Sequence, residues 1–259
     1  MKKNSIMAVA ACLGCLILLG QGAFAHADEI KVMSAVAMRA AIDDLAPRFE
    51  RETGHKVTIS YATAGVLRDR ILGGETVDLA ILPRPAMDPV VKEGKIASDT
   101  VAVFARSAVS IAVRIGAPKP DISTVEAFKR AMLAAKSVSY ADPARGGGSG
   151  IHFVSVLQRL AIFEEMKPKT KLVQGDESVQ LVAKGEAEIA AVNTPVILRE
   201  PGVELVGPLP AELQNTVDFV FFVGVGVNAK EPEAAKALIK YLLAPDAARV
   251  IKAKGLEPG

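Results

Sequence analysis

Aromatic residues and cysteines are scarce in this chain. Tryptophan is absent, aromatic side chains make up 5% of the 259 residues, and there are only two cysteines. The shortage of aromatic rings argues against a sugar-stacking site or a stacking platform for nucleobases. Both cysteines, Cys12 and Cys15, fall within residues 1–25, which we predict below to be a signal peptide. The mature chain is therefore expected to contain no disulfide, no cysteine-ligated zinc and no iron–sulfur cluster.

An excess of charge of one sign is also missing. The chain has 31 Lys and Arg residues against 29 Asp and Glu residues. Removal of residues 1–25 takes away Lys2 and Lys3 and no acidic residue, which leaves 29 charges of each sign. The mature protein is thus expected to have no bulk charge that would recruit nucleic acid or an anionic membrane. With 50% apolar and 23% charged residues, the composition is that of a globular protein with one large or two smaller domains.

The N-terminus has the pattern of a secretory signal peptide over residues 1–25. Two lysines precede an apolar run over residues 6–19, and Ala23-Phe24-Ala25 supplies the small residues of a cleavage site before His26. A second cleavage option lies before Asp28. An uncleaved membrane anchor is the alternative, but the apolar run is short for a spanning helix. We therefore predict cleavage, export to the periplasm and no membrane insertion of the mature chain.

Strand and helix patterns alternate along the mature chain. The expected strands are residues 29–34, 56–61, 77–82, 137–140, 171–174 and 189–193, with a further strand within residues 104–115 and a long apolar strand region over residues 216–227. The expected helices are residues 37–53, 66–72, 87–93, 125–134, 151–163, 177–184, 232–243 and 246–254. The alternation predicts an α/β fold with mainly parallel sheets. Pro47 lies inside the first helix and predicts a kink or a break there.

Four loops that follow strands are small or hydroxylated, over residues 34–38, 62–65, 142–150 and 193–195. In open α/β sheets, ligands lie beyond the carboxyl ends of the strands, and free N–H groups at helix starts favour an anion. The run Gly146–Gly150 lacks the Gly-Lys-Ser/Thr ending of a nucleotide-binding loop. Whether this run is a flexible turn or a ligand loop stays open on local sequence.

Residues that could carry catalysis form no recognisable constellation. His26, His55 and His152 are the only histidines, their spacing suits no metal, and there is no Gly-x-Ser-x-Gly elbow. Asp43-Asp44 and Glu164-Glu165 fit charges on helix faces better than acid–base pairs. We therefore expect a binding protein without metal or cofactor rather than an enzyme. An exported enzyme is the second class considered, and a search for turnover would separate the two.

Seven segments spread over the mature chain together resemble one family. They are MSAVAM (33–38), RFERETG (48–54), SYATAGVL (60–67), VDLAI (77–81), ADP (141–143), GEAEIA (185–190) and YLLAPDAA (241–248). With these segments the chain resembles the periplasmic molybdate-binding proteins of ABC importers, which have the type II periplasmic-binding fold. The resemblance implies two lobes, each with a mixed sheet flanked by helices, and a hinge between them.

The resemblance also implies how the chain is divided and what it meets. Lobe one is expected over residues 28–107 and 217–259, and lobe two over residues 108–216. The protein would be a monomer that carries a small anionic ligand to the membrane subunits of an importer.

The chain departs from the family pattern at several ligand positions. One serine before the first helix maps to Ala37, and one in the second loop maps to Ala64, with Thr63 and Ser34 as possible substitutes. The tyrosine of the fourth loop maps to Asn193. The small residue of the third loop maps to Ser149, and Gly150 follows it. A hydroxyl lost from a dry anion site leaves a ligand oxygen unpaired, which costs about 1–3 kcal/mol.

Two ligand classes follow from these positions. The first is molybdate or a similar oxyanion, and the alternative is a small organic carboxylate held by the same loops with Arg145 or Asn193. Hydroxyl and amide donors of Thr63, Ser149, Asn193 and Thr194 suit partly charged oxygens. The full set of candidate ligand-binding residues is Ser34, Ala37, Met38, Thr63, Ala64, Arg145, Ser149, Gly150, Asn193 and Thr194.

Overall fold

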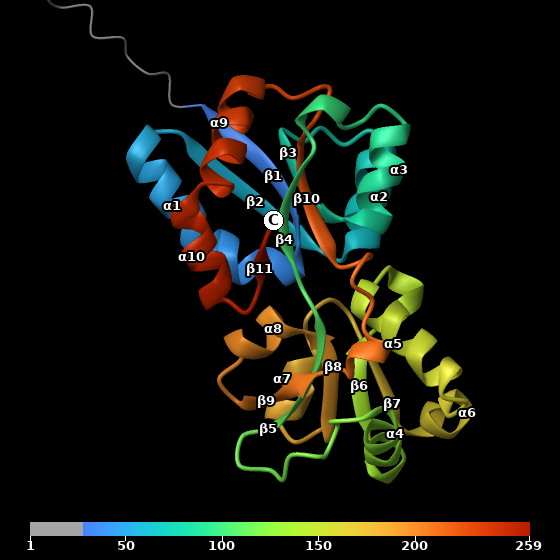
Figure 1. Cartoon of the computed structure of the whole chain (residues 1–259). Helices are drawn as coiled ribbons and strands as arrows, with labels where there is room; N and C mark the ends of the chain where they lie inside the picture. The colour runs from blue at the N-terminus through green and yellow to red at the C-terminus, as the bar shows by residue number, and fades with distance from the viewer. Residues whose placement is uncertain (1–27) are drawn as a thin grey trace, which may run out of the picture.

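Two sheets organise the chain, in a computed structural model that describes residues 28–259. The predicted signal peptide and both cysteines lie outside the described residues. The first sheet has the strand order β11-β4-β10-β3-β1-β2, and the second has the order β7-β6-β8-β5-β9. Figure 1 shows the two sheets one above the other, each flanked by its own helices. The expected α/β class with two lobes is therefore confirmed.

Lobe one contains the first sheet and the helices around it. Its strands are β1 (Glu29–Ala35), β2 (Lys56–Ala62), β3 (Leu79–Pro83), β4 (Ala102–Arg106), β10 (Val220–Val225) and β11 (Glu257–Pro258). Its helices are the short η1 (Val36–Met38), α1 (Arg39–Thr53), α2 (Ala64–Leu72), α3 (Arg84–Lys92), η2 (Ser98–Thr100), α9 (Pro232–Leu242) and α10 (Pro245–Ala253).

Lobe two contains the second sheet. Its strands are β5 (Val109–Arg114), β6 (Val138–Ala141), β7 (Thr170–Val173), β8 (Ile189–Asn193) and β9 (Val203–Pro208). Its helices are α4 (Val125–Ala134), η3 (Pro143–Arg145), α5 (Gly148–Arg159), α6 (Phe163–Met166), η4 (Lys167–Lys169), α7 (Ser178–Ala183), α8 (Thr194–Arg199) and η5 (Ala211–Leu213).

Both sheets are mixed rather than mainly parallel. Strand β1 runs parallel to β2 and β3, but β10 runs antiparallel to β3 and β4. In the other sheet, β6 runs parallel to β7 and β8, but β5 runs antiparallel to β8 and β9. Each antiparallel pair contains β11 or a strand that leads into or out of a connection between the lobes. The alternation of strands and helices in the sequence does not reveal the direction of these strands.

The chain crosses between the lobes twice. The segment 104–115, which was expected to contain a strand, holds the end of β4 and the whole of β5, which residues 107–108 separate and which belong to different sheets. The return runs from β9 to β10 through residues 209–219. The side-chain amide of Gln214 donates to the Val109 carbonyl (2.7 Å) and accepts from the Val109 N–H (3.3 Å), so it ties the returning crossing to the start of β5. The expected lobe limits at residues 107 and 217 fall in these segments and remain a prediction.

Helix α1 shows how apolar spacing places a helix on the sheet. Ala41, Ile42, Leu45 and Phe49 are buried, and Gly54 ends the helix in the left-handed conformation at φ 81°. The helix runs without interruption through Pro47, so the expected break is absent. Pro47 is exposed, where water can satisfy the carbonyl group that has lost its partner.

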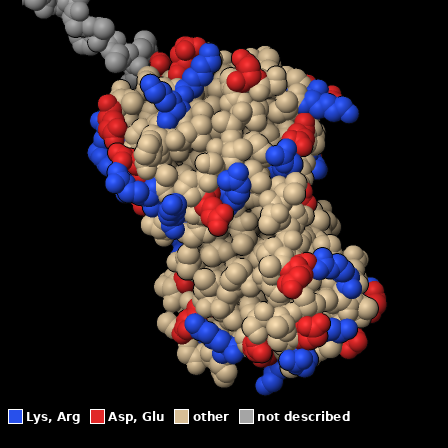
Figure 2. Space-filling model, in the orientation of Figure 1, with Lys and Arg blue, Asp and Glu red and all other residues tan. Residues whose placement is uncertain are grey.

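The surface carries both signs of charge. In Figure 2, basic and acidic side chains are interspersed over both lobes on the face in view. Among the described helices, none combines the length and the apolar character that crossing a membrane requires.

Candidate functional site

A small cavity lies between the lobes, where strands end and helices begin. It encloses about 40 Å³, which is room for roughly three water-sized groups. Its walls come from lobe one, from lobe two and from the returning crossing. The lining residues are Ala35, Val36, Ala37, Thr63, Ala64, Pro83, Ala141, Gly147, Gly148, Ser149, Gly175, Val192, Asn193, Val196, Phe219 and Phe221.

The lobe-one wall is built from the ends of β1 and β2. Val36 and Ala37 follow β1, and Thr63 and Ala64 follow β2 at the start of α2. Thr63 is only 7% exposed, and its hydroxyl donates to the main-chain carbonyl of Arg145 in lobe two (2.9 Å). This side chain therefore both lines the cavity and joins the lobes.

The lobe-two wall contains the glycine-rich segment. Helix α5 begins at Gly148, three residues before the expected start, so Ser149 and Gly150 lie in its first turn. Asp142 fixes the preceding turn: its carboxylate accepts from the Ala144 N–H, and its carbonyl accepts from the Gly147 N–H. A Cβ atom on Gly150 would lie 1.7 Å from the Ala141 carbonyl oxygen, so glycine is required for α5 to pack on β6.

Asn193 is the last residue of β8 and lines the cavity from lobe two. It is 6% exposed, and its amide donates to the Ser107 hydroxyl in the first crossing (3.3 Å). Its neighbour Thr194 is turned elsewhere, since its hydroxyl pairs with the Ser110 hydroxyl (2.7 Å) and the Ala108 carbonyl (3.3 Å).

The structure thus places half of the candidate ligand residues in the lining. Those residues are Ala37, Thr63, Ala64, Ser149 and Asn193. Outside the lining are Ser34, Met38, Arg145, Gly150 and Thr194. The Arg145 side chain pairs with the exposed Gln174 (3.3 Å), and Ser34 and Met38 are fully buried. That any of the ten contacts a ligand remains a prediction.

Sequence reasoning missed the apolar part of the lining. Phe219 comes from the returning crossing and Phe221 from β10, and Pro83 and Val196 come from the end of β3 and from α8. The only sequence signal was an apolar strand over residues 216–227, which did not reveal that it forms a wall of the cavity.

The cavity lining is electrically neutral at the side-chain level, because its polar side chains are those of Thr63, Ser149 and Asn193. Five helices, η1–α1, α2, α3, α5 and α8, begin at it. First-turn amides lack partners within their helix and carry the positive end of its dipole. The lining therefore suits a small anion. Within residues 28–259, no cluster of His, Cys, Asp or Glu suits a metal ion.

Polar contacts join the lobes beside the cavity. Asp176, next to the lining Gly175, pairs with Arg199 of its own lobe and lies 3.8 Å from the Arg39 guanidinium of lobe one. The Arg39 guanidinium lies 4.6 Å from the centre of the Tyr61 ring. Burial, and the hydrogen bond that its hydroxyl donates to Asp43, raise the pKa of Tyr61 well above its usual range.

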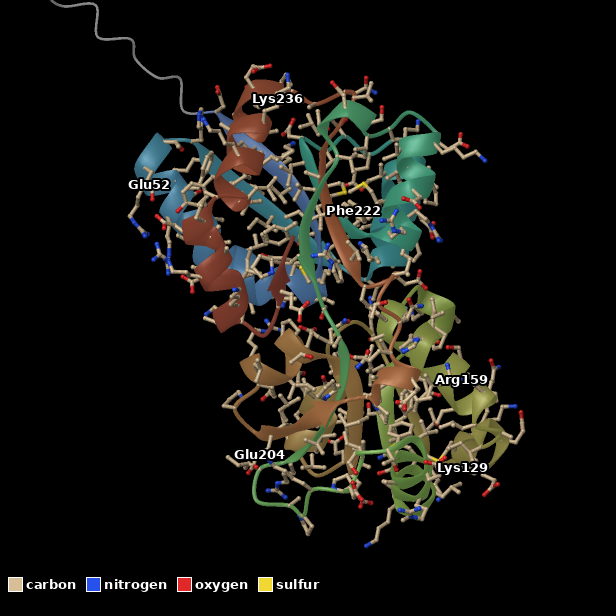
Figure 3. The ribbon with its side chains drawn as sticks, viewed as in Figure 1. Glu52, Lys129, Arg159, Glu204, Phe222 and Lys236 are labelled. Carbon is tan, nitrogen blue, oxygen red and sulfur yellow. The ribbon has the colours of Figure 1, made fainter. Side chains whose placement is uncertain are left out.

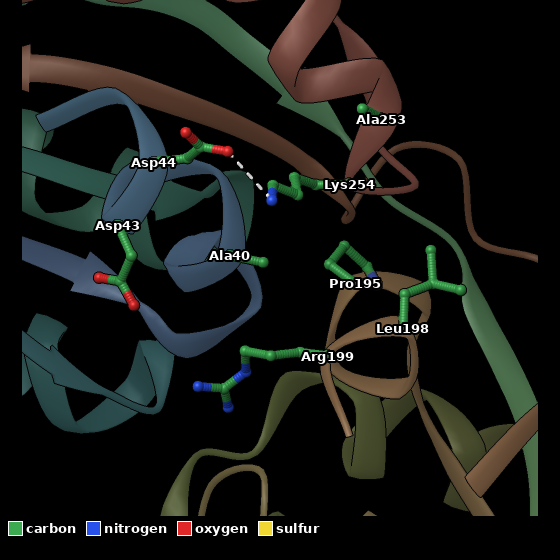
Figure 4. A pocket seen from close by; sticks show the side chains of 8 residues that line it. All are labelled: Ala40, Asp43, Asp44, Pro195, Leu198, Arg199, Ala253 and Lys254. Atoms are coloured by element: carbon green, nitrogen blue, oxygen red, sulfur yellow. Dashed lines mark ion pairs between the residues drawn. The ribbon is translucent and has the colours of Figure 1, made fainter. Parts of the chain in front are cut away.

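A larger groove of about 480 Å³ lies to one side of the same seam, between α1 and α10 of lobe one and α8 of lobe two (Figure 4). Asp44 and Lys254 form an ion pair across it (3.1 Å), and hydrogen bonds from Lys254 and Arg48 lower the pKa of Asp44. Asp43 and Arg199 also have partners within the protein. Because its charges are already paired, we place the functional site in the smaller cavity.

A histidine lies behind the cavity wall. The His152 ring on α5 packs edge-on against the lining Phe219, with 5.5 Å between ring centres. Its Nε2 atom is buried and has no hydrogen-bond partner among the described residues. Burial lowers the pKa of His152. On the same helix, Arg159 (Figure 3) donates to the Glu212 carbonyl, which attaches the returning crossing to lobe two.

Comparisons with known proteins agree with this architecture. The family described as "Bacterial extracellular solute-binding protein" matches residues 30–257. An aconitate isomerase from Pseudomonas sp is 31% identical over 255 residues, which is 95% of each chain. The molybdate-binding protein ModA from Azotobacter vinelandii is 28% identical over 253 residues, covering 93% of this chain and 95% of that one.

Solved structures show the same fold. The periplasmic molybdate-binding protein of Azotobacter vinelandii superposes with a TM-score of 0.75 at 17% identity, over 89% of this chain and 99% of that one. The resemblance to molybdate-binding proteins is thus confirmed. The expectation that the chain is not an enzyme is wrong, because the aconitate isomerase matches nearly its whole length. The absence of a hydrolase elbow and of a metal-ligand cluster does not separate a binding protein from an isomerase, since an isomerase needs neither.

Proposed function

Because the chain belongs to the family of bacterial extracellular solute-binding proteins, we propose that it is a periplasmic receptor that binds a small anion between its lobes. The ligand would then pass to the membrane subunits of an ABC importer. One observation carries the proposal: a small cavity of about 40 Å³ between the lobes, with neutral polar side chains in its lining and five helix starts around it. A molybdate-like oxyanion presents only acceptor oxygens, which matches the chemistry of this lining.

The test is ligand-dependent stabilisation of the mature chain. Molybdate, tungstate, sulfate, phosphate and a series of small carboxylates would be added one at a time during thermal unfolding. An anion at a hundred times its dissociation constant stabilises the folded state by about 2.7 kcal/mol. A shift with oxyanions supports the first ligand class, and a shift with carboxylates alone supports the second. No shift with any of them would contradict the receptor proposal.

A second candidate function is isomerisation of a small unsaturated carboxylate, which the aconitate isomerase relative favours. Isomers of such a compound can interconvert when a base removes a proton from the carbon next to the double bond and returns it to the far carbon of that double bond, so that the double bond moves over by one carbon. The cavity lining has no titratable side chain; His152 packs against the lining Phe219 from behind and would act as the base only once that ring moves aside. Its lowered pKa keeps the imidazole neutral at pH 7, as a proton acceptor must be.

Proton NMR of cis- and trans-aconitate with catalytic amounts of the protein tests this second function. We expect the signals of one isomer to convert into those of the other, and His152→Gln to slow the conversion while thermal unfolding shows an intact fold. Unchanged spectra with a protein that aconitate stabilises would leave binding as the function.

A further inference from the structure

The lobes touch backbone to backbone at two glycines. The Gly65 N–H, in the first turn of α2, donates to the Gly146 carbonyl in lobe two (3.3 Å). A Cβ atom on Gly65 would lie 2.6 Å from the Gly146 Cα atom, and one on Gly146 would lie equally close to the Gly65 Cα atom. Such a distance is far inside van der Waals contact, so only a residue without a side chain allows this approach.

The two glycines are sequence neighbours of residues in both cavity walls. Thr63 and Ala64 immediately precede Gly65 in lobe one, and Gly147 and Gly148 immediately follow Gly146 in lobe two. The Thr63 hydroxyl and the Arg145 carbonyl form the neighbouring interlobe hydrogen bond. The distance between these two walls is therefore set where the glycines meet.

From this geometry we infer that Gly65 and Gly146 are specificity-determining residues. Their contact sets how far the lobes close, and hence the size of the anion that receives donors from both walls. The inference rests on the proposed function of the cavity. A small oxyanion needs the full approach for simultaneous contact with Thr63 and Ser149, whereas a larger carboxylate bridges walls that stand further apart.

The two glycines differ in how cleanly they can be tested. Gly146 has a φ of 72°, so a side chain there strains the backbone whether or not the lobes close. Gly65 lies in α2 outside the left-handed region, and alanine is the better helix former there. Gly65→Ala thus acts against closure and not against folding.

Gly207→Ala is the matched control. It adds the same methyl group in β9 of lobe two, where the new Cβ atom would lie 3.8 Å from the Ile122 side chain, an ordinary contact. Neither Gly207 nor Ile122 belongs to the cavity lining.

The experiment measures dissociation constants by calorimetry for pairs of anions that differ in size: sulfate against molybdate, and malonate against tricarballylate. For each pair that binds, we expect Gly65→Ala to weaken the smaller anion by at least about tenfold and the larger one by less. Thermal unfolding without ligand should show equal or higher stability, and Gly207→Ala should bind both anions like the wild type. Equal losses for both members of a pair, or no loss, would overturn the inference.

A readout without ligand separates this inference from the proposed function. Small-angle X-ray scattering should give a larger radius of gyration for Gly65→Ala than for the wild type, with Gly207→Ala equal to the wild type. If the wild type binds none of the anions, the receptor proposal fails and scattering alone decides. An unchanged radius in that case rejects the glycine contact as the limit of closure.

Discussion

Ser149 is one of three polar side chains in the cavity wall, and its hydroxyl is a donor from lobe two. We predict that Ser149→Ala weakens the bound anion by about tenfold to a hundredfold, because a ligand oxygen loses its partner in a dry site, at about 1–3 kcal/mol. Isothermal titration calorimetry checks the change. Thr194→Val is the matched control, since the Thr194 hydroxyl is turned to Ser110 and Ala108, away from the cavity. An equal loss in both variants would assign the effect to folding.

A second residue, His152, makes the free energy of unfolding depend on pH. Burial lowers its pKa in the folded protein below the ordinary value of 6.5, so the unfolded chain takes up the proton first as the pH falls. The stability that its neutral form contributes is present above pH 6.5 and is lost as the pH falls through the folded-state pKa. Two charged groups also act on the pKa of His152: the Asp218 charge raises it, and the Arg159 charge lowers it.

We therefore predict that His152→Gln has a flatter stability profile below pH 6.5 than the wild type. Urea unfolding at a series of pH values from 7.5 to 5 measures it. Parallel profiles for the two proteins would show that this histidine titrates alike in the folded and unfolded chains.

At the scale of elements, the turn before α5 holds the lobe-two wall. The Asp142 carboxylate accepts from the Ala144 N–H (2.9 Å), and the Asp142 N–H donates to the Val173 carbonyl (2.8 Å). We predict that Asp142→Ala lowers the free energy of unfolding by about 1 kcal/mol and also weakens anion binding, because the first turn of α5 loses its support. Asp142→Asn keeps an acceptor oxygen and should retain most of both. Denaturant unfolding and calorimetry on the two variants make the comparison.

Most elements could be predicted from the sequence, because each has a periodic apolar face or a clear stop signal. Helix α1 and strand β8 were placed within two residues by their buried positions and by Gly54. Strand β9 and helix α8 were missed, since Pro195 and the short Val203–Pro208 segment offer little periodicity. The expected helix start at residue 151 was late, because the first three residues of α5 are two glycines and a serine, which have weak helical propensity. The close approach of Gly150 to Ala141 depends on tertiary packing, which the local sequence does not show.

The site was less predictable than the fold. Thr63, Ser149 and Asn193, which the sequence suggested because they follow strands, line one cavity, and their contact with a ligand stays a prediction. The same reasoning could not show which way a side chain turns, so Arg145 and Thr194 were grouped with residues that they do not join. Contacts between lobes, such as those of Gly65 and Asp176, depend on the relative position of two separate sheets and leave no local pattern.

On the scale of the whole molecule, an ion pair spans the lobes. The Arg39 guanidinium lies 3.8 Å from Asp176, and their side chains are 29% and 15% exposed. We predict that Arg39→Ala weakens anion binding severalfold at low salt, because the closed form loses an attraction of about 0.2–1 kcal/mol. The difference from the wild type should shrink as salt screens the pair.

Arg48→Ala is the control for that prediction. Arg48 pairs with Asp44 four residues away on the same helix, so its loss removes a charge of the same kind without touching the other lobe. Calorimetry at two ionic strengths compares the three proteins. If the affinity of Arg39→Ala depends on salt as the wild type does, the interlobe pair contributes nothing to closure.

The strand order of lobe one has a consequence for the sequence of events in which the chain assembles. Strand β10 lies between β3 and β4 inside the first sheet, yet it follows the whole of lobe two along the chain. A polypeptide that emerges N-terminus first can complete the second sheet once residue 208 has appeared, while β3 still presents an unpaired edge. The second sheet can thus be complete before the first sheet, although the first sheet begins earlier in the sequence. The last forty residues, which include β10 and β11, then complete lobe one.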